Sequence, residues 1–337
     1  MRAMVLYEHG GVENLTYERN YRDPEPGPGE VLLRMRACAL NYHDVFTRKG
    51  MPGIKVPLPI ILGNDAAGDI VAVGREVTGF AVGDRVVVDP IERARGGLLG
   101  ETMDGGLGEL IRVPAYMLVK LDPAVSYAAA AALPVAYGTA HKMMLSRGGL
   151  KAGEKVLILG ASGGVGTCCV QLAKQAGCTV IACASSDDKL ARLKALGADI
   201  GINYATADWV AECRRLFGRA HVYDKTSGGI DVVVNFTGGD TWTKSLKVLK
   251  RDGRLLTCGA TAGYDPPEDI RFIWTFELNI IGSNGWRRED VTALLDLVKT
   301  GKLTPAIHPQ RFTIEDARAA MALLDDRAVI GKVIVEP

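Results

Sequence analysis

The chain has 337 residues, of which 47% are hydrophobic and 23% are charged, a balance typical of a globular protein with one large domain or two ordinary ones. The 40 Lys and Arg residues against 39 Asp and Glu give a formal net charge of +1. Because there is no basic excess, the composition argues against a nucleic-acid partner and against binding to an anionic membrane.

The first residues, Met1 to Gly11, do not combine a basic segment with a long apolar run, so we expect no signal peptide. We find no apolar stretch long enough to span a bilayer. The 7 cysteines are scattered without a C-x-x-C pair, which argues against a disulfide framework or a structural zinc site. We therefore expect a cytoplasmic protein.

The first third of the chain is typical of β-structure. Short apolar runs at Val31–Met35, Ile70–Val73 and Arg85–Val88 are separated by turns rich in Gly and Pro. Short strands at this close spacing predict a partly closed antiparallel barrel.

After Pro123 the pattern changes to alternating helices and strands. Ser126–Arg147 is rich in Ala and predicts a helix that starts at Ser126. Helices are also predicted at Gly164–Gly177 and Asp187–Leu196. The predicted strands are Val156–Gly160, Thr179–Ala184, Ile200–Asn203, Asp231–Phe236, Arg254–Cys258 and Asn279–Gly282. Six continuous apolar strands alternating with helices predict a parallel sheet of the complete dinucleotide-binding (Rossmann) type.

The tail predicts two helices, Asp290–Lys299 and one near Ile314–Leu324, and a last strand at Lys332–Val335. We expect this strand to return to the first domain. The predicted domains are therefore residues 1–126 with 284–337, and residues 127–283.

The segment Val156–Gly166 carries the strongest local motif, because a glycine-rich turn stands between a predicted strand and a predicted helix. In such a turn Gly163 lets the backbone approach a pyrophosphate, and Gly166 lets the helix pack against the strand. Ala161 occupies the first glycine position of the G-x-G-x-x-G pattern. The alternative is a tight turn without a ligand.

The next strand indicates which nucleotide binds. An NAD enzyme places a carboxylate near its end, but the expected position is Ala184, followed by Ser185, with Lys189 one turn into the next helix. A hydroxyl and an ammonium group suit a 2′-phosphate, so we predict NADPH. In the alternative, Ser185 and Ser186 only cap the helix and Lys189 is a solvated charge.

The two-part layout and the turn Ala161–Gly166 resemble the medium-chain dehydrogenase/reductase superfamily over essentially the whole chain. Further stretches that resemble it are Pro26–Val31, Gly63–Gly68, Gly83–Val86, Gly105–Glu109 and Gly331–Lys332. The resemblance implies a GroES-like catalytic β-barrel domain, a Rossmann domain and a cleft between them. With the turn motif, it predicts these cofactor-binding residues: Tyr137, Thr139, Gly160, Ala161, Ser162, Gly163, Gly164, Val165, Ser185, Lys189, Tyr204, Phe236, Thr237, Cys258, Gly259, Ala260, Ser283 and Lys332.

The alcohol dehydrogenases of this superfamily hold a catalytic zinc ion with a Cys, a His and a Cys. Asn41 stands at the first ligand position, Asn64 at the second, and Leu133–Tyr137 offers neither Cys nor His at the third. Cys38 and His43 lie near but have no third partner that we can place. Zinc needs thiolate, imidazole or carboxylate ligands, so we predict that no catalytic zinc is bound. The segment that carries the structural zinc in that group, here Asp89–Glu101, has no cysteine.

The zinc-free branch contains quinone reductases and 2-enoyl reductases. Ala39–Tyr42, Gly100–Thr102, Trp274 and Ile281–Asn284 resemble stretches of crotonyl-CoA carboxylase/reductases. In that family a Phe stands at the position of Gly100 and a His at the position of Asn284, and both residues help to hold carbon dioxide. This chain has neither of them. The resemblance therefore implies reduction of an activated C=C bond, or of a quinone, rather than carboxylation.

Without a metal ion, hydrogen-bond donors must hold the enolate oxygen that forms after hydride transfer. The amides of Asn41, Asn64 and Asn284 are candidates. The alternative for each is an ordinary loop amide that satisfies backbone groups, and for Asn41 the two interpretations have about equal weight. His43 is the preferred proton donor, although a packing histidine is the competing interpretation. Tyr42 and Tyr137 are alternative donors. Asp65 and Glu101 are candidate carboxylates of the cleft, predicted either to orient the donors or to reach the substrate.

Two other functions stay open: a zinc-free enzyme of the alcohol dehydrogenase type, and a protein that binds NADPH without turnover. We expect a small-molecule substrate. We also expect a homodimer in which the apolar strand Asn279–Gly282, with Phe272–Phe276, pairs across the partner.

Overall fold

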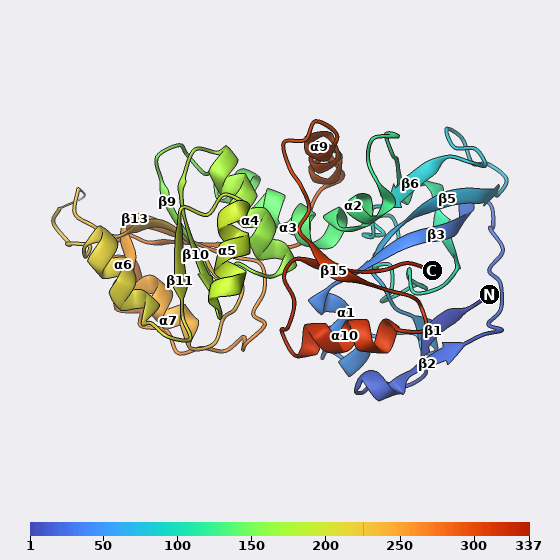
Figure 1. Ribbon diagram of the computed structural model, residues 1–337, viewed down its shortest axis with the longest axis horizontal. Coiled ribbons are helices and arrows are strands. Elements are labelled where there is room, and N and C mark those ends of the chain that lie inside the picture. The colour runs from blue at the N-terminus through green and yellow to red at the C-terminus, as the bar shows by residue number, and fades with distance from the viewer. Residues whose placement is uncertain (225) are drawn as a thin grey trace. The chain divides into compact units, whose positions relative to one another are not determined.

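The computed structural model describes residues 1–224 and 226–337, and it divides into two compact units. The first unit comprises Met1–Tyr137 with Arg288–Pro337, and the second comprises Gly138–Arg287 (Figure 1). The first unit thus extends to Tyr137 and the second to Arg287, where the predicted domains end at Ser126 and Ser283.

The first unit is built on a 7-stranded sheet with the order β15-β16-β3-β5-β6-β8, in which β7 also pairs with β3. Its strands are β3 (Glu30–Leu40), β5 (Asp65–Val73), β6 (Arg85–Val88), β7 (Leu110–Pro114), β8 (Leu118–Lys120), β15 (Ile307–Phe312) and β16 (Lys332–Val335). All pairs are antiparallel except β15 with β16. The predicted antiparallel architecture is confirmed, and among the described residues the strands pair along an open path rather than around a closed ring.

The last strand joins this sheet because β16 pairs with the end of β3, with Val333 opposite Leu40. In the first half of β3, alternate side chains from Val31 to Met35 are buried, as expected for a strand with one face on a core. A smaller sheet has the order β2-β1-β4, formed by β1 (Ala3–Leu6), β2 (Leu15–Glu18) and β4 (Ile60–Ile61).

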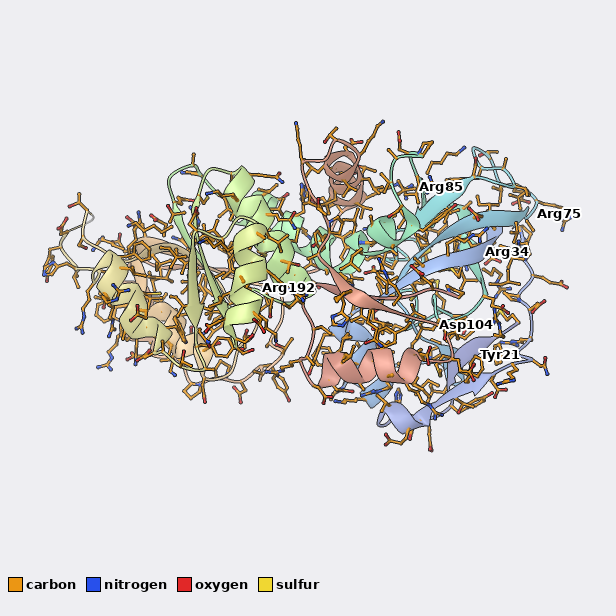
Figure 2. All side chains as sticks on the ribbon, viewed as in Figure 1. Tyr21, Arg34, Arg75, Arg85, Asp104 and Arg192 are labelled. Carbon is orange, nitrogen blue, oxygen red and sulfur yellow. The ribbon has the colours of Figure 1, made fainter. Side chains whose placement is uncertain are left out.

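The helices of the first unit are short except for α9. They are α1 (Tyr42–Lys49), α2 (Tyr127–Ala131), α9 (Arg288–Lys299) and α10 (Ala317–Asp325), with 3-10 turns at Val12–Asn14 and Ala115–Met117. The guanidinium of Arg85 on β6 (labelled in Figure 2) lies 4.4 Å from the centre of the Tyr127 ring. This contact fixes α2 against the sheet.

The predicted helix Ser126–Arg147 is broken into several pieces. Ser126 caps α2 as expected, because its Oγ accepts a hydrogen bond of 3.2 Å from the Ala129 N–H. The chain then forms π-helical segments at Leu133–Tyr137 and Lys142–Arg147, on either side of α3 (Gly138–His141). The first π-helical segment contains Pro134, which has no N–H to continue an α-helical ladder.

The second unit contains a 6-stranded parallel sheet with the order β11-β10-β9-β12-β13-β14. Its strands are β9 (Lys155–Ile158), β10 (Thr179–Ala184), β11 (Ile200–Asn203), β12 (Ile230–Val234), β13 (Leu249–Thr257) and β14 (Asn279–Gly282). Its further helices are α4 (Gly164–Gln175), α5 (Asp187–Ala195), α6 (Trp209–Phe217), α7 (Thr241–Leu246) and α8 (Ile270–Thr275). The predicted Rossmann-type sheet is confirmed. Its strand order reverses between β9 and β12, and ligands of such sheets bind beyond the carboxyl ends of the strands at that point.

Across the described parts of the chain, none of the helices has both the length and the apolar character needed to cross a membrane.

Candidate active site

The loops that follow β9, β12 and β13 meet at the carboxyl edge of the parallel sheet. The backbone of Phe236 accepts a hydrogen bond of 3.2 Å from Thr261, and that of Thr237 accepts one of 2.7 Å from Ala262. A Cβ atom on Gly160 would lie 3.1 Å from the Phe236 ring. The structure therefore brings the predicted cofactor residues of these loops together, and Ser283 joins them through a hydrogen bond of 2.9 Å from its N–H to Thr257.

Within the turn after β9, the glycines have different roles. A Cβ on Gly166 would lie 2.4 Å from the Gly160 carbonyl oxygen, so this position must be glycine for α4 to pack against the strand. A Cβ on Gly163 would meet only that same oxygen, at 3.6 Å, and would otherwise point into open space. Gly163 is also the N-cap of α4, and no side chain caps the helix. The free helix N-terminus and the open space beside it suit a pyrophosphate.

At the end of β10, the two serines have separate partners. Ser186 caps α5, because its Oγ accepts a hydrogen bond of 3.4 Å from the Lys189 N–H. The Lys189 Nζ instead donates to the Ser185 Oγ at 3.4 Å. Helix capping therefore accounts for Ser186 but not for Ser185, whose hydroxyl lies beside an ammonium group. Tyr204 follows β11 at the same edge and is exposed.

Three predicted cofactor residues lie away from this edge or its loops. Thr139 belongs to α3 of the second unit and is half-buried. Tyr137 and Lys332 belong to the first unit, and both are buried there. The Tyr137 hydroxyl accepts a hydrogen bond of 2.8 Å from the Ala306 N–H. The Tyr137 hydroxyl and the Lys332 ammonium group therefore already have hydrogen-bond partners in the first unit, whether or not either one contacts a cofactor.

In the first unit, Asn41, Asp65 and Lys332 form a buried polar cluster. The Asp65 Oδ2 accepts hydrogen bonds from the Lys332 Nζ at 3.0 Å and from the Asn41 Nδ2 at 2.9 Å, and Lys332 also donates to the Asn41 Oδ1. The Asp65 Oδ1 accepts from the Val135 N–H at 2.9 Å. Burial raises the pKa of Asp65, although Lys332 and Asn41 act against this.

This cluster changes the role predicted for Asn41. Its Nδ2 donates to Asp65 and, at 3.4 Å, to the Ala39 carbonyl oxygen. Because an amide NH₂ has two hydrogens, neither is left for a substrate oxygen. These contacts favour a structural role for Asn41, as a partner of the buried Asp65 carboxylate, over the predicted role of enolate donor.

Asn64 is also fully buried, and its Nδ2 donates to the Leu99 carbonyl oxygen at 2.6 Å. Its Oδ1 has no hydrogen-bond partner among residues 1–224 and 226–337. The Asn64 amide is thus oriented by the backbone through one of its two Nδ2 hydrogens, and its role as a substrate donor stays a prediction.

Asp44 is a buried residue that the sequence reasoning missed. Its Oδ1 accepts hydrogen bonds of 3.1 Å from the N–H groups of Gly63 and Asn64, and its Oδ2 accepts one of 2.7 Å from Asn41. Asp44 thereby ties the start of α1 to the loop before β5. Burial raises the pKa of Asp44 to about 6. The available signal was its spacing three residues after Asn41, which is that of a capping box.

His43 and Glu101 are brought together by the structure, with the His43 Nε2 in direct contact with the Glu101 Oε2. The side chains retain 30% and 11% of their exposure, so the imidazole stays accessible while the carboxylate is nearly buried. Burial lowers the pKa of His43, but the hydrogen bond and the charge of Glu101, with the charge of Asp44, more than offset it, and the net pKa is raised. This is the arrangement of an oriented acid.

The other candidates do not join this pair in the first unit by any described contact. The Tyr42 ring packs edge-on against Phe46, with ring centres 5.0 Å apart. Asn284 lies in the second unit, is exposed, and accepts a hydrogen bond of 2.8 Å at its backbone oxygen from the Lys142 Nζ.

Burial raises the pKa of Cys258, one of the predicted cofactor residues, to about 12, so its thiol stays protonated at neutral pH.

The residues at the zinc-ligand positions do not suit zinc, because Asn41 and Asn64 offer amides that are already hydrogen-bonded. In the described ranges, no group of three or more His, Cys, Asp and Glu side chains is placed to hold a metal ion. Zinc independence stays a prediction on the chemistry of these side chains.

The fold and the nucleotide-binding edge define an oxidoreductase of the nicotinamide-dependent class, and comparison with known proteins agrees. Residues 27–123 match the family described as alcohol dehydrogenase GroES-like domain, and residues 164–300 match that described as zinc-binding dehydrogenase. The chain belongs to the medium-chain dehydrogenase/reductase superfamily.

Among the similar proteins, the 2-methylene-furan-3-one reductase of Solanum lycopersicum is 33% identical over 100% of this chain and 79% of its own length. The chloroplastic NADPH-dependent alkenal/one oxidoreductase of Arabidopsis thaliana is 32% identical over 100% of this chain and 80% of its own. A solved structure described as an NAD-dependent alcohol dehydrogenase is 37% identical, with a TM-score of 0.91, over 100% of both chains.

Proposed function

We propose that this chain is a zinc-independent, NADPH-dependent reductase of an activated C=C bond, in an enone or enoyl thioester, or of a quinone. The observation that carries the proposal is the state of the zinc-ligand positions. Asn41 is committed to the buried Asp65 and Lys332, and Asn64 is committed to the Leu99 backbone. Without a Lewis acid at this position, a conjugated double bond is an easier substrate than an isolated ketone, because its negative charge spreads into an enolate.

The reduction requires a hydride at the β-carbon and a proton at the α-carbon. NADPH, when bound, supplies the hydride and leaves as NADP⁺. His43 supplies the proton from its ring, and Glu101 keeps the imidazole protonated and oriented. Asn284, whose side chain is exposed, remains the candidate amide donor for the enolate oxygen.

The choice of NADPH over NADH rests on Ser185 and Lys189. Their side chains lie together at the end of β10, where an NAD enzyme would have a carboxylate. The same helix carries Asp187 and Asp188 in its first turn and Arg192 further along (Figure 2), so Lys189 is the cation that directly contacts Ser185. The Arabidopsis relative, named as NADPH-dependent, supports the same cofactor.

Replacement of Lys189 tests this cofactor choice. In Lys189→Gln, kcat/KM for NADPH should fall roughly tenfold, the value of one charge-assisted contact, while kcat/KM for NADH stays unchanged. Lys194→Gln, an exposed lysine on the same helix, is the matched control. Equal losses with both cofactors, or a loss in the control, would refute the assignment of the 2′-phosphate site to Lys189.

Metal analysis tests the central feature of the mechanism. Protein treated with a chelator and shown to be free of zinc should reduce an enone at the untreated rate. An alcohol dehydrogenase is the second candidate, favoured by the description of the 37% identical solved structure. Stoichiometric zinc together with alcohol oxidation that is lost on chelation would establish that candidate instead.

A further inference from the structure

The second unit contains a cavity of about 480 Å³, and most of the residues that line it have no predicted role. Its volume falls in the range of small-molecule sites. It lies where α7 and the segment after β13 approach each other, and its lining includes Gly259, Ala260, Trp242, Tyr264, Asp265 and Glu268. Gly259 and Ala260 are also predicted cofactor residues, so the cavity adjoins the nucleotide edge.

The strand order shows which end of a bound nucleotide the cavity meets. The turn after β9 suits the pyrophosphate, and the proposed adenosine end lies at Ser185, beyond β10. The strands β12 and β13 stand on the opposite side of β9. The cavity, which includes Gly238 after β12 and Gly259 after β13, therefore lies on the nicotinamide side, where the substrate must also be.

Two aromatic residues on this cavity offer flat apolar surfaces. The indole Nε1 of Trp242 donates a hydrogen bond of 3.0 Å to the Glu268 Oε1, which fixes the ring. Tyr264 is 91% exposed, so its ring is accessible to a ligand. Each of the two rings can stack on a flat aromatic ligand.

The charge of the cavity restricts its ligand further. Asp265 and Glu268 contribute two carboxylates, and among the described lining residues there is no Lys or Arg. A CoA thioester carries several phosphate charges and would be repelled at this position. An uncharged flat molecule would not be.

We infer that the cavity beside Trp242 and Tyr264 binds the distal part of an uncharged, flat, conjugated carbonyl substrate, an aryl enone or a quinone, and disfavours CoA thioesters. This inference rests on the proposed function and narrows its substrate class.

The first test is the replacement of Tyr264, assayed with benzylideneacetone as the aryl enone. Tyr264→Ala should raise KM for benzylideneacetone about 3- to 10-fold, the range of one aromatic contact, while kcat changes by less than about twofold. Tyr264→Phe should restore the wild-type KM. Tyr223→Ala is the matched control, because Tyr223 is 93% exposed in the same unit but does not line the cavity.

The second test concerns charge. The double variant Asp265→Asn/Glu268→Gln keeps the oxygen that accepts from Trp242 but removes both charges. At low salt it should raise kcat/KM for crotonyl-CoA roughly 3- to 10-fold and leave that for benzylideneacetone within about twofold. Asp326→Asn, an exposed acid of the first unit, should change neither. Parallel changes for both substrates would overturn the charge argument.

Binding measurements separate this inference from the proposed function. Calorimetric titration of benzylideneacetone into the NADP⁺-bound protein should show binding that Tyr264→Ala weakens. Binding that depends on Tyr264 without any turnover would overturn the proposed function and support the cavity. Turnover with a KM indifferent to Tyr264, or a variant that weakens NADPH binding in place of substrate binding, would overturn the cavity assignment.

Discussion

At the scale of single residues, the contact between His43 and Glu101 raises the pKa of the proposed proton donor. Both side chains were candidates from the sequence, but 58 positions separate them along the chain, and only the fold brings the imidazole and the carboxylate together. Burial alone would lower the pKa of His43, so the raised pKa depends on its acidic neighbours, Glu101 first and Asp44 second. A raised pKa keeps more of the imidazole protonated at a given pH, which favours proton donation to an enolate.

This pair predicts a specific pH dependence. Since the pKa of His43 is raised, kcat should decline only as the pH rises through that raised value. In Glu101→Gln the charge that raises the His43 pKa is lost while the burial that lowers it remains, so the decline of kcat should move to lower pH. In His43→Gln this limb should disappear, with kcat reduced about 100-fold. The measurement is kcat against pH for the three proteins, and identical profiles for wild type and Glu101→Gln would contradict the assignment.

The same pair contributes to stability with a defined sign. A histidine whose folded pKa is raised stabilises the protein fully below its unfolded pKa, about 6.5, and this contribution is lost as the pH rises through the folded value. Asp44 acts in the same direction, because burial raises its pKa to about 6, so its contribution is lost as the pH rises from the unfolded pKa, about 3.9, to about 6.

Residue roles were the part that the sequence predicted least well. Asn41 and Asn64 were predicted as substrate donors because of the positions they occupy, but an amide can face a substrate or a buried carboxylate, and the sequence does not distinguish these. The hydrogen bonds of Asn41 to Asp65 and of Asn64 to the Leu99 backbone favour structural roles for both amides. Asp44 was missed because a buried carboxylate that binds three backbone N–H groups has no sequence signature beyond its spacing from Asn41.

At the scale of elements, the turn between β9 and α4 separates packing from ligand binding. A Cβ atom added to Gly166 would lie only 2.4 to 2.6 Å from backbone atoms, whereas one added to Gly163 would face open space. The two glycines of one motif should therefore respond differently to the same small change.

Gly166→Ala should destabilise the protein by about 1–3 kcal/mol, since the added methyl group meets backbone that must move. Gly163→Ala should leave the free energy of unfolding nearly unchanged, because its extended backbone accepts alanine, but should weaken NADPH binding about tenfold or more. Urea unfolding and fluorescence titration measure the two effects. Loss of stability in Gly163→Ala with unaltered NADPH affinity would show that no ligand approaches this turn.

Five of the six strands of the second unit were predicted to within two residues at each end. The first residues of β13 were missed, because the charged residues Lys250, Arg251 and Asp252 interrupt the apolar run there. Thr179–Ala184, Ile200–Asn203 and Asn279–Gly282 agree with the structure at both ends. The prediction of one continuous helix over Ser126–Arg147 was wrong, because it followed the Ala-rich composition and did not allow for the break at Pro134.

At the scale of the whole molecule, one apolar surface of the second unit has no partner within the described chain. The strand β14 stands at the edge of the parallel sheet. Beside it, Trp274 and Ile270 of α8 are 68% and 64% exposed, and Ile280 of β14 is 37% exposed. An apolar edge strand of this kind is usually covered, and we propose that a second copy of this chain covers it.

Light scattering at micromolar concentration tests the homodimer. The wild-type protein should have the mass of a dimer, and Ile280→Lys should shift it to a monomer, because a charge on the edge strand opposes pairing. Tyr223→Ala, exposed elsewhere in the same unit, should leave the mass unchanged. A monomeric wild type would refute the proposal.

We propose above all that this medium-chain protein reduces an activated double bond or a quinone with NADPH and without zinc. The most direct measurement is the loss of the reduced-nicotinamide absorbance when the zinc-free protein receives NADPH or NADH with an aryl enone, a small quinone or crotonyl-CoA. We expect turnover of at least one acceptor, faster with NADPH than with NADH. Tight NADPH binding without NADPH oxidation by any acceptor would contradict this function. The chain would then be a protein that binds NADPH without reductase activity.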